Sequence, residues 1–307
     1  MADSNRTSPA PGAPLPASAC AGVTAIVTGA SRGLGREIAR ALAAAGASVV
    51  LVARSAEDLD ATRRRVEPHL APGAHVRACP IDLSSDGAAD RLARQLEQDG
   101  LEPDALVNNA AVQGPVGPFW KNDWREWVDS FHLNAFSPLL LTRAFLPGMI
   151  RRGWGKVVFL SGGGATGPRP RFTAYGAAKT LLVRFSETLS AELAGTGVEA
   201  NAVAPGAMKS AMTDAILAAG PGNAGEKEYA AARKLAQGTE AVVSRAAALC
   251  VFLCSHRSDG ISGRLISAAW DPWEALPEHR EELAGSDVYA LRRIVPKDRG
   301  MGWGEPR

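Results

Sequence analysis

Between residues 23 and 270, the chain alternates regularly between short apolar runs and longer amphipathic stretches. Alternation of this kind is typical of a parallel sheet covered by helices on both faces. We therefore predict an α/β fold with a doubly wound parallel sheet of about seven strands, in one domain over residues 22–270. The expected strands are 23–28, 48–53, 76–81, 105–107, 156–160, 198–203 and 264–267, and the expected helices are 33–45, 56–66, 87–98, 123–145, 174–194 and 239–254.

The two ends of the chain differ from this pattern. Residues 1–21 are rich in Pro, Ala and Ser, which predicts a disordered tail. Residues 271–307 carry some apolar side chains, so we expect this extension to pack on the domain or on a neighbouring subunit. No apolar run follows Arg6 as in a signal peptide, and none is long enough to span a membrane. We expect a cytoplasmic protein without a membrane partner.

The net charge and the cysteine positions argue against a nucleic-acid-binding protein and against a metal-binding protein. A net charge of +2 argues against nucleic acid as an obligatory partner. The four cysteines form no metal-binding pattern, and Cys250 and Cys254 lie one helical turn apart in an apolar run. We therefore expect reduced core thiols and no bound metal.

A glycine-rich turn, Thr28-Gly-Ala-Ser-Arg-Gly-Leu-Gly35, joins the first expected strand to the first helix. Backbone N–H groups and a helix N-terminus at this place can hold a pyrophosphate, as in a Rossmann fold. The spacing is G-x-x-x-G-x-G, whereas the commoner fingerprint is G-x-G-x-x-G. The turn nevertheless favours nucleotide binding over a glycine turn without a ligand.

The end of the second expected strand indicates which dinucleotide would bind. An acidic residue there would accept the ribose 2′-hydroxyl of NAD, but the chain has Ala53 followed by Arg54. Arg32 in the glycine turn supplies a second guanidinium, and two guanidiniums suit a 2′-phosphate. We predict NADP(H) as the cofactor, with NAD(H) less favoured.

Tyr175 and Lys179 lie four positions apart in the apolar run from Ala174 to Leu193, on one face of the expected helix. An ammonium group within about 4–6 Å would favour the phenolate and lower the tyrosine pKa by roughly 1–3 units. Tyr175 could then act as a general acid or base near neutral pH. The pair alone is weak evidence, because a buried tyrosine and a lysine often occur at this spacing.

The ordered set of motifs resembles the short-chain dehydrogenase/reductase family over residues 23 to about 268, in its branch of 3-oxoacyl carrier-protein reductases. The matching motifs are Thr28–Gly35, Asp82, Asn108–Ala111, Asn134, Tyr175 with Lys179, and Pro205-Gly206. Ala111 stands where the family usually has glycine. The resemblance implies that Tyr175 is the acid/base, that Lys179 binds the nicotinamide ribose and lowers the tyrosine pKa, and that Asn134 holds a water of the proton relay.

The resemblance also implies a cofactor-binding set. Its members follow the expected strands or belong to the catalytic helix, and Ser210 stands where a threonine is more usual. The set is Gly29, Ser31, Arg32, Gly33, Leu34, Gly35, Arg54, Asp82, Leu83, Asn109, Ala110, Ala111, Tyr175, Lys179, Pro205, Gly206, Met208 and Ser210.

The serine that family members usually place 13 residues before the tyrosine is missing, because this position is Gly162. Ser161 stands one residue earlier, where a regular strand would aim it away from the cleft. Either a glycine-assisted bulge turns Ser161 inward, or a backbone N–H of Gly162–Gly164 binds the substrate oxygen. Of these two, we favour Ser161 as the fourth catalytic residue.

The sequence therefore predicts an NADP-dependent oxidoreductase acting on a small alcohol or carbonyl compound, with hydride passing between the nicotinamide and the substrate carbon. A sugar-nucleotide or polyol dehydrogenase or epimerase and a nucleotide-sensing protein with weak turnover are the alternatives. A ketoacyl thioester, a polyketide-type ketone and a sugar or cyclic polyol all remain open as substrates. We expect segment 211–237 to form a mobile lid. The apolar helices 123–145 and 174–194 predict self-association, and the resemblance implies a homodimer or homotetramer.

Overall fold

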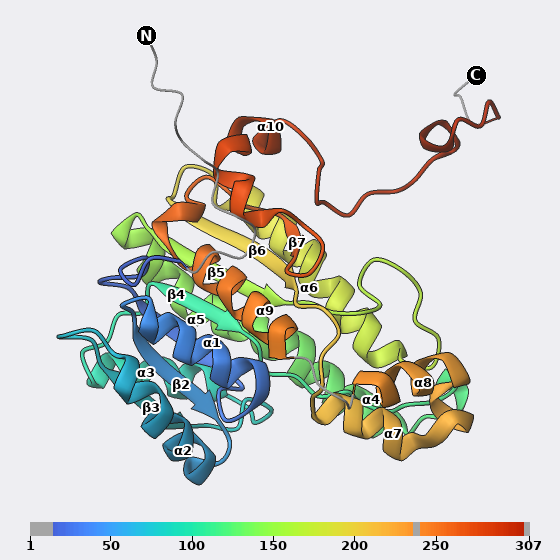
Figure 1. The fold of residues 1–307 in the computed structure, drawn as a ribbon, viewed down its shortest axis with the longest axis horizontal. Helices are drawn as coiled ribbons and strands as arrows, with labels where there is room; N and C mark the ends of the chain where they lie inside the picture. Colours follow the sequence, from blue (N-terminus) through green and yellow to red (C-terminus); the bar gives the residue numbers. More distant parts are fainter. Residues whose placement is uncertain (1–14, 236–239, 304–307) are drawn as a thin grey trace.

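The fold was analysed in a computed structural model that describes residues 15–235 and 240–303 (Figure 1). Within these residues, seven strands form one parallel sheet in the order β3-β2-β1-β4-β5-β6-β7. This arrangement confirms the predicted doubly wound sheet, because the chain order reverses direction between β1 and β4. The strands are β1 (Thr24–Thr28), β2 (Ser48–Ala53), β3 (Val76–Pro80), β4 (Ala105–Asn108), β5 (Gly155–Leu160), β6 (Val198–Ala204) and β7 (Leu265–Ser267).

Helices cover both faces of the sheet, and each face has its own apolar core. The helices α1 (Gly33–Ala44), α2 (Ala56–Val66) and α9 (Glu240–Leu253) lie on one face, where α1 packs along α9. The helices α3 (Ala88–Gln98), α5 (Ser137–Arg152) and α6 (Thr173–Glu192) lie on the other. Strands between two such layers are mostly apolar, and β4 and β5 are buried along their whole lengths.

The expected helix 123–145 consists of three parts. Helix α4 (Trp124–Phe131) continues through a π-helical turn (His132–Phe136) into α5, which ends at Arg152, before Gly153. The left-handed backbone of Gly153 (φ 71°) closes α5. Amphipathic periodicity predicts a helix over this region, but it does not reveal the extra residue that a π-turn inserts.

Two helices form most of the segment that we expected to be a lid. Helix α7 (Ala211–Ala224) and helix α8 (Glu226–Leu235) pack against each other beyond the carboxyl ends of the strands (Figure 1). They share a small core in which Phe172, Ile216, Ala224 and Ala232 are buried. The last two expected lid residues, 236 and 237, lie outside the described residues.

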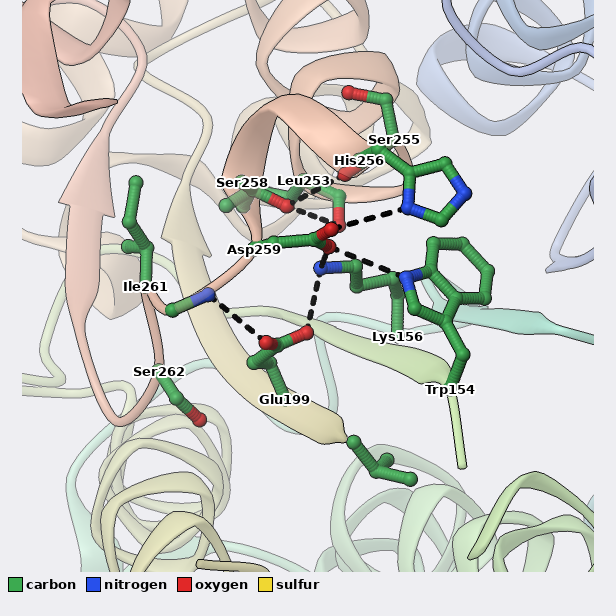
Figure 2. Close-up of polar contacts among 12 residues, drawn as sticks. Trp154, Lys156, Glu199, Leu253, Ser255, His256, Ser258, Asp259, Ile261 and Ser262 are labelled. Carbon is green, nitrogen blue, oxygen red and sulfur yellow. Dashed lines mark hydrogen bonds and ion pairs between the residues drawn. The ribbon is translucent and has the colours of Figure 1, made fainter. Parts of the chain in front are cut away.

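A buried ionic cluster joins the amino-terminal ends of β5 and β6, at the opposite end from α7 and α8. Figure 2 shows the Lys156 ammonium group between the carboxylates of Glu199 (2.5 Å) and Asp259 (2.6 Å). Lys156 is only 1% exposed, so its charge needs these partners. Trp154 Nε1 donates to the same Asp259 carboxylate at 3.2 Å. The cluster fixes the strand ends far from the candidate site.

The described terminal residues pack on the domain for part of their length. Of the expected tail 1–21, residues 15–21 are described, and Cys20 is fully buried beside α9. The extension after β7 contains α10 (Arg280–Ala284) and packs on the domain through Arg264, whose guanidinium donates to the carbonyls of Leu283, Ser286 and Val288. Residues 292–303 then run away from the domain (Figure 1). Short 3₁₀ turns occur at Glu67–His69, Phe119–Lys121, His256–Ser258, Trp273–His279 and Pro296–Arg299.

Candidate active site

Helix α6 places Tyr175 and Lys179 one turn apart in its first half, beside the carboxyl end of β5. Both side chains are buried, with exposures of 7% and 2%. The Lys179 Nζ atom lies 5.5 Å from the centroid of the tyrosine ring and donates to the Leu160 carbonyl at 2.8 Å. The strand end therefore orients the ammonium group toward the phenol, as the helical spacing predicts.

Burial dominates the electrostatics of this pair. It raises the pKa of Tyr175 above the ordinary phenol value, with partial opposition from the charge of Arg169. It lowers the pKa of Lys179 to about 8. The expected lowering of the tyrosine pKa is therefore not found, because the loss of water around the phenolate outweighs the attraction of the Arg169 charge.

The residues after β5 determine which group faces the tyrosine. A Cβ atom on Gly162 would lie 2.5 Å from the Tyr175 hydroxyl oxygen, so Gly162 faces the phenol directly. Ser161 instead continues the sheet pattern through its N–H bond to Val203, and its hydroxyl lies 3.5 Å from the Lys179 carbonyl. The strand alternation persists to Ser161, so the bulge that would turn this residue inward is not found. The structure therefore does not bring the Ser161 hydroxyl to the phenol.

Asn134 lies in the middle of the π-helical turn and is fully buried. Its side chain forms two hydrogen bonds with the main chain of Val112, accepting from the N–H at 2.9 Å and donating to the carbonyl at 2.8 Å. Asn134 thus holds the segment that follows β4 against the helix that precedes α5. π-Turns are frequent at functional sites, because they displace backbone groups from the regular helical pattern.

The glycine turn packs closely against the end of β4. A Cβ atom on Gly35 would lie 2.3 Å from the Gly29 carbonyl oxygen, so a larger residue cannot occupy this position without moving the backbone. Gly33 has a left-handed backbone (φ 53°), and apart from its chain neighbours and the backbone of α1 nothing lies within 4 Å of its Cβ position. Arg32 is the N-cap residue of α1 and forms no side-chain capping bond. The first turn of α1 therefore faces open space next to Gly33.

Thr28 and Asn109 connect the glycine turn to β4. The Thr28 hydroxyl accepts from the N–H groups of Asn109 and Ala110, each at 2.9 Å. The Asn109 side chain donates to the Thr28 carbonyl at 2.8 Å. Next to it, both side-chain polar atoms of Asn108 are buried and form no hydrogen bond with the described residues. An unpaired buried amide costs roughly 1–3 kcal/mol, so a ligand or water would stabilise it.

The arginines expected to bind a 2′-phosphate are both exposed at the carboxyl ends of β1 and β2. Arg32 begins α1, and Arg54 follows β2 directly. Asp82 accepts from the hydroxyl and the N–H of Ser84, and these bonds, together with the charge of Arg54, hold the pKa of Asp82 below its ordinary value. Leu83, the next residue, is buried against the α3 face.

The segment after β6 leads into α7. Gly206 has a left-handed backbone (φ 91°), and a Cβ atom there would lie 3.0 Å from Val242 on α9. Ser210 is the N-cap residue of α7, and its N–H donates to the Thr213 hydroxyl at 3.2 Å. That hydroxyl donates to the Met208 carbonyl at 3.0 Å. Pro205 to Ser210 therefore form a fixed connection between the sheet and α7.

One residue near the tyrosine was missed by the sequence reasoning. Arg169 lies between β5 and α6, stacks on the Phe172 ring at 4.1 Å, and forms an ion pair with Glu228 of α8 at 2.7 Å. Its guanidinium carbon and one nitrogen lie within 4 Å of the Cβ position of Gly163. Two arginines alternating with prolines in Pro168-Arg-Pro-Arg171, shortly before Tyr175, were the available signal.

In residues 15–235 and 240–303, no helix is both long and apolar enough to cross a membrane. The four cysteines are free and buried, which confirms that Cys250 and Cys254 are reduced core thiols. Burial raises the pKa of Cys250 to about 12, so this thiol is not a nucleophile near neutral pH.

Comparisons with known proteins agree with this geometry. The family model for short chain dehydrogenases matches residues 23–220. A short chain dehydrogenase of Pseudocercospora fijiensis is 37% identical over 275 residues, which cover 86% of this chain and 85% of that protein. A ketoacyl reductase of a Nostoc species is 37% identical over 186 residues, covering 60% of this chain and 63% of that protein.

A solved structure extends the similarity to a cofactor complex. A Beutenbergia cavernae protein, whose crystal structure contains NADP, is 26% identical and superimposes with a TM-score of 0.70. The superposition covers 85% of this chain and 99% of that one. The matched family model spans more than half of the chain, and the fold and order of motifs agree with it. The chain therefore belongs to the short-chain dehydrogenase/reductase family of oxidoreductases.

Proposed function

We propose that the protein is an NADP(H)-dependent oxidoreductase that interconverts an alcohol and a carbonyl compound, with Tyr175 as the acid/base. The observation that carries this proposal is the buried Tyr175–Lys179 pair of α6, at the same edge of the sheet as the glycine turn of β1. Parallel strands bring their carboxyl ends to one edge, and ligands bind there in doubly wound sheets.

The residues at this edge fit a dinucleotide. The open first turn of α1 beside Gly33 suits a pyrophosphate, because its N–H groups and the helix dipole attract an anion. The exposed Arg32 and Arg54 suit the 2′-phosphate of NADP, and the unpaired Asn108 amide is a polar group that a bound ligand or water would satisfy. The cofactor, when bound, supplies or accepts the hydride.

The protein's own groups handle the proton. Tyr175 donates it to the substrate oxygen during reduction and takes it back during oxidation. In this proposal Lys179 binds the nicotinamide ribose and lowers the pKa of Tyr175 once ligands add polar partners to the site, and the bond from its ammonium group to the Leu160 carbonyl supports this role. Both side-chain atoms of Asn134 bond to Val112, so we assign the relay water to the main chain of the π-turn.

A backbone N–H of Gly162–Gly164 is our choice for the second donor to the substrate oxygen. Gly162 faces the Tyr175 hydroxyl, whereas the hydroxyl of Ser161 lies against the Lys179 carbonyl. A backbone donor needs no side chain, and the glycines leave room for the substrate beside the phenol. Such a donor stabilises the developing oxyanion as in other carbonyl chemistry.

The test is a screen of ketones, ketoacyl thioesters and cyclic polyols, following nicotinamide absorbance, with the parent protein and Tyr175→Phe. We expect turnover by the parent and a loss of about 10²–10⁴-fold in the variant, with cofactor affinity nearly unchanged, because only the proton donor is removed. A variant that keeps more than a few per cent of the activity would show that Tyr175 has another role. Tight cofactor binding without any turnover would favour a nucleotide sensor.

A further inference from the structure

The loop between β5 and α6 brings an arginine to the edge of the candidate site. Arg169 follows the run Gly162–Gly164, and its Cδ and Nη1 atoms lie 3.8 Å from the Cβ position of Gly163. The Cβ position of the preceding residue, Gly162, lies 2.5 Å from the Tyr175 hydroxyl oxygen. Consecutive Cα atoms are about 3.8 Å apart. The guanidinium and the phenol therefore flank neighbouring residues of one short glycine run.

The guanidinium is held in place from the other side. Its Nε and Nη2 atoms donate to one carboxylate oxygen of Glu228 on α8, at 3.2 Å and 2.7 Å. Its plane lies over the Phe172 ring, with 4.1 Å between the guanidinium carbon and the ring centroid. Both bonds to Glu228 use nitrogens other than Nη1, and Nη1 is the nitrogen beside Gly163. The arginine is thus oriented before any ligand binds.

Arg171, two residues later, makes different contacts. Its Nη1 atom donates to the carbonyls of Gly222 and Asn223 at the end of α7, at 2.5 Å and 3.0 Å. Arg171 has a left-handed backbone (φ 75°), which is unusual for a residue with a side chain. Both arginines therefore dock the α7–α8 helices onto the loop before α6, but Arg169 is the one beside the glycine run.

We propose that Arg169 determines substrate specificity by binding, through Nη1, an anionic group of the substrate a few bonds from the reacting carbonyl. This inference rests on the proposed oxidoreductase function of the same site. A carboxylate and a phosphate share the required chemistry, because each accepts charge-assisted bonds from a guanidinium. The guanidinium already binds the Glu228 carboxylate. The negative charge of this carboxylate offsets part of the attraction of Arg169 for a second anion.

The charge of Arg169 also reaches the phenol, where it opposes the effect of burial on the pKa of Tyr175. The ion pair with Glu228 is partly exposed, with side-chain exposures of 20% and 31%, so a substrate anion can reach the guanidinium. Partly exposed pairs contribute little to stability. Substitution of either partner should therefore cost the fold little.

The experiment uses the full chain with NADPH and three matched pairs of carbonyl substrates. The pairs are 3-oxobutanoate and its methyl ester, 4-oxopentanoate and its methyl ester, and dihydroxyacetone phosphate and dihydroxyacetone. We expect the parent to prefer the anionic member of at least one pair. In Arg169→Gln, kcat/KM for that member should fall about 10–100-fold, mainly through KM, while its neutral partner changes less than about threefold. The preferred pairs distinguish a carboxylate from a phosphate.

Two variants separate anion binding from helix docking. Arg171→Gln removes docking bonds to α7 without removing the charge beside Gly163, so it should affect both members of each pair equally. Glu228→Gln removes the competing carboxylate and should lower KM for the anionic member severalfold. A parent protein indifferent to the charge, or an Arg169→Gln variant that loses both members equally, would overturn the proposal and leave the oxidoreductase function intact.

Calorimetry with the same pairs, on protein saturated with NADP⁺, measures substrate affinity and so tests the role of Arg169 independently of turnover. Binding that favours the anionic member and is lost in Arg169→Gln supports the role of Arg169 even if no pair is reduced. That combination would count against the proposed oxidoreductase function alone. Equal binding of both members by the parent would count against the role of Arg169.

Discussion

The Tyr175 hydroxyl oxygen lies 2.5 Å from the position that a Cβ atom would take on Gly162. No side chain could stand at Gly162 with the tyrosine in its present place, because real Cβ atoms essentially never approach another heavy atom so closely. The tyrosine thus occupies the space that a serine at this position would need. The present place of the phenol therefore requires a glycine at position 162.

Gly162→Ala should therefore reduce turnover by at least about tenfold. The added methyl group would push the phenol away from its position, and a small misplacement of a reacting group can cost about 10²-fold. Gly167→Ala is the matched control, since Gly167 lies in the same loop outside the run Gly162–Gly164, and nothing beyond its chain neighbours lies within 4 Å of its Cβ position. Steady-state rates of both variants check the prediction, and equal activities would show that the close contact does not constrain Tyr175.

Ser161→Ala should lose less than about threefold in turnover. The Ser161 hydroxyl lies against the Lys179 carbonyl at 3.5 Å, a long contact that contributes little. Removal of a true oxyanion donor costs about 10²–10³-fold. The rate of the variant on any substrate of the parent decides between these values. A loss of 10²-fold or more would return the catalytic role to Ser161.

Arg32→Ala and Arg54→Ala should each weaken NADPH binding by about 10–100-fold and NADH binding by less than about threefold. Both side chains are exposed at the strand ends, where a 2′-phosphate would accept charge-assisted bonds worth roughly 1.5–3 kcal/mol each. Calorimetric titration of each dinucleotide measures the effect, with Arg65→Ala on α2 as the exposed control. Tighter binding of NADH than of NADPH by the parent would contradict the cofactor assignment.

The buried Lys179 should make stability depend on pH in a defined window. Its pKa is about 8 in the folded protein, and near 10.4 in the unfolded chain. Between these values the unfolded state binds more protons, so the free energy of unfolding rises with pH through this window and falls again as pH drops to about 8. The full change is about 3 kcal/mol, from the two pKa values.

Denaturant unfolding of the parent and Lys179→Met from pH 7 to 11 isolates this contribution, because the other titrating groups cancel in the difference. We expect the parent to gain stability relative to the variant as pH rises. A difference that stays constant across the window would show that the Lys179 pKa is not lowered by burial.

The protein should self-associate through α4 and α5. The side chains of Trp124 and Val128 on α4, Phe136 in the π-turn and Leu140 on α5 are 42–63% exposed. Exposed apolar side chains gathered in this way are typical of protein–protein interaction sites. Light scattering at micromolar concentration should give a multiple of the 32.1 kDa chain mass, and Leu140→Glu should lower it. Val288→Glu, on the exposed C-terminal extension, is the control, and a monomeric parent would contradict the prediction.

The sequence predicted most of what depends on local pattern. The seven strands agree with their expected ranges to within a residue or two, because apolar runs between two helical layers are buried along their whole length. The glycine turn was predictable from its place between the first strand and the first helix. In the structure, a Cβ atom on Gly29 would lie 2.9 Å from Ala110 Cα, and one on Gly35 would lie 2.3 Å from the Gly29 carbonyl oxygen. The four-residue spacing of Tyr175 and Lys179 placed both on one helix face.

Other features were decided only by the tertiary structure, because they depend on residues far apart in the chain. The expected lid consists of two packed helices, and Arg169 meets Glu228 across 59 positions. The π-turn at Asn134 depends on Val112 in another segment. The pKa of Tyr175 is raised and not lowered because the packed domain buries the phenol deeply. Local periodicity determined the elements, whereas solvation and long-range contacts determined which groups the site presents, because both exist only once the chain is folded.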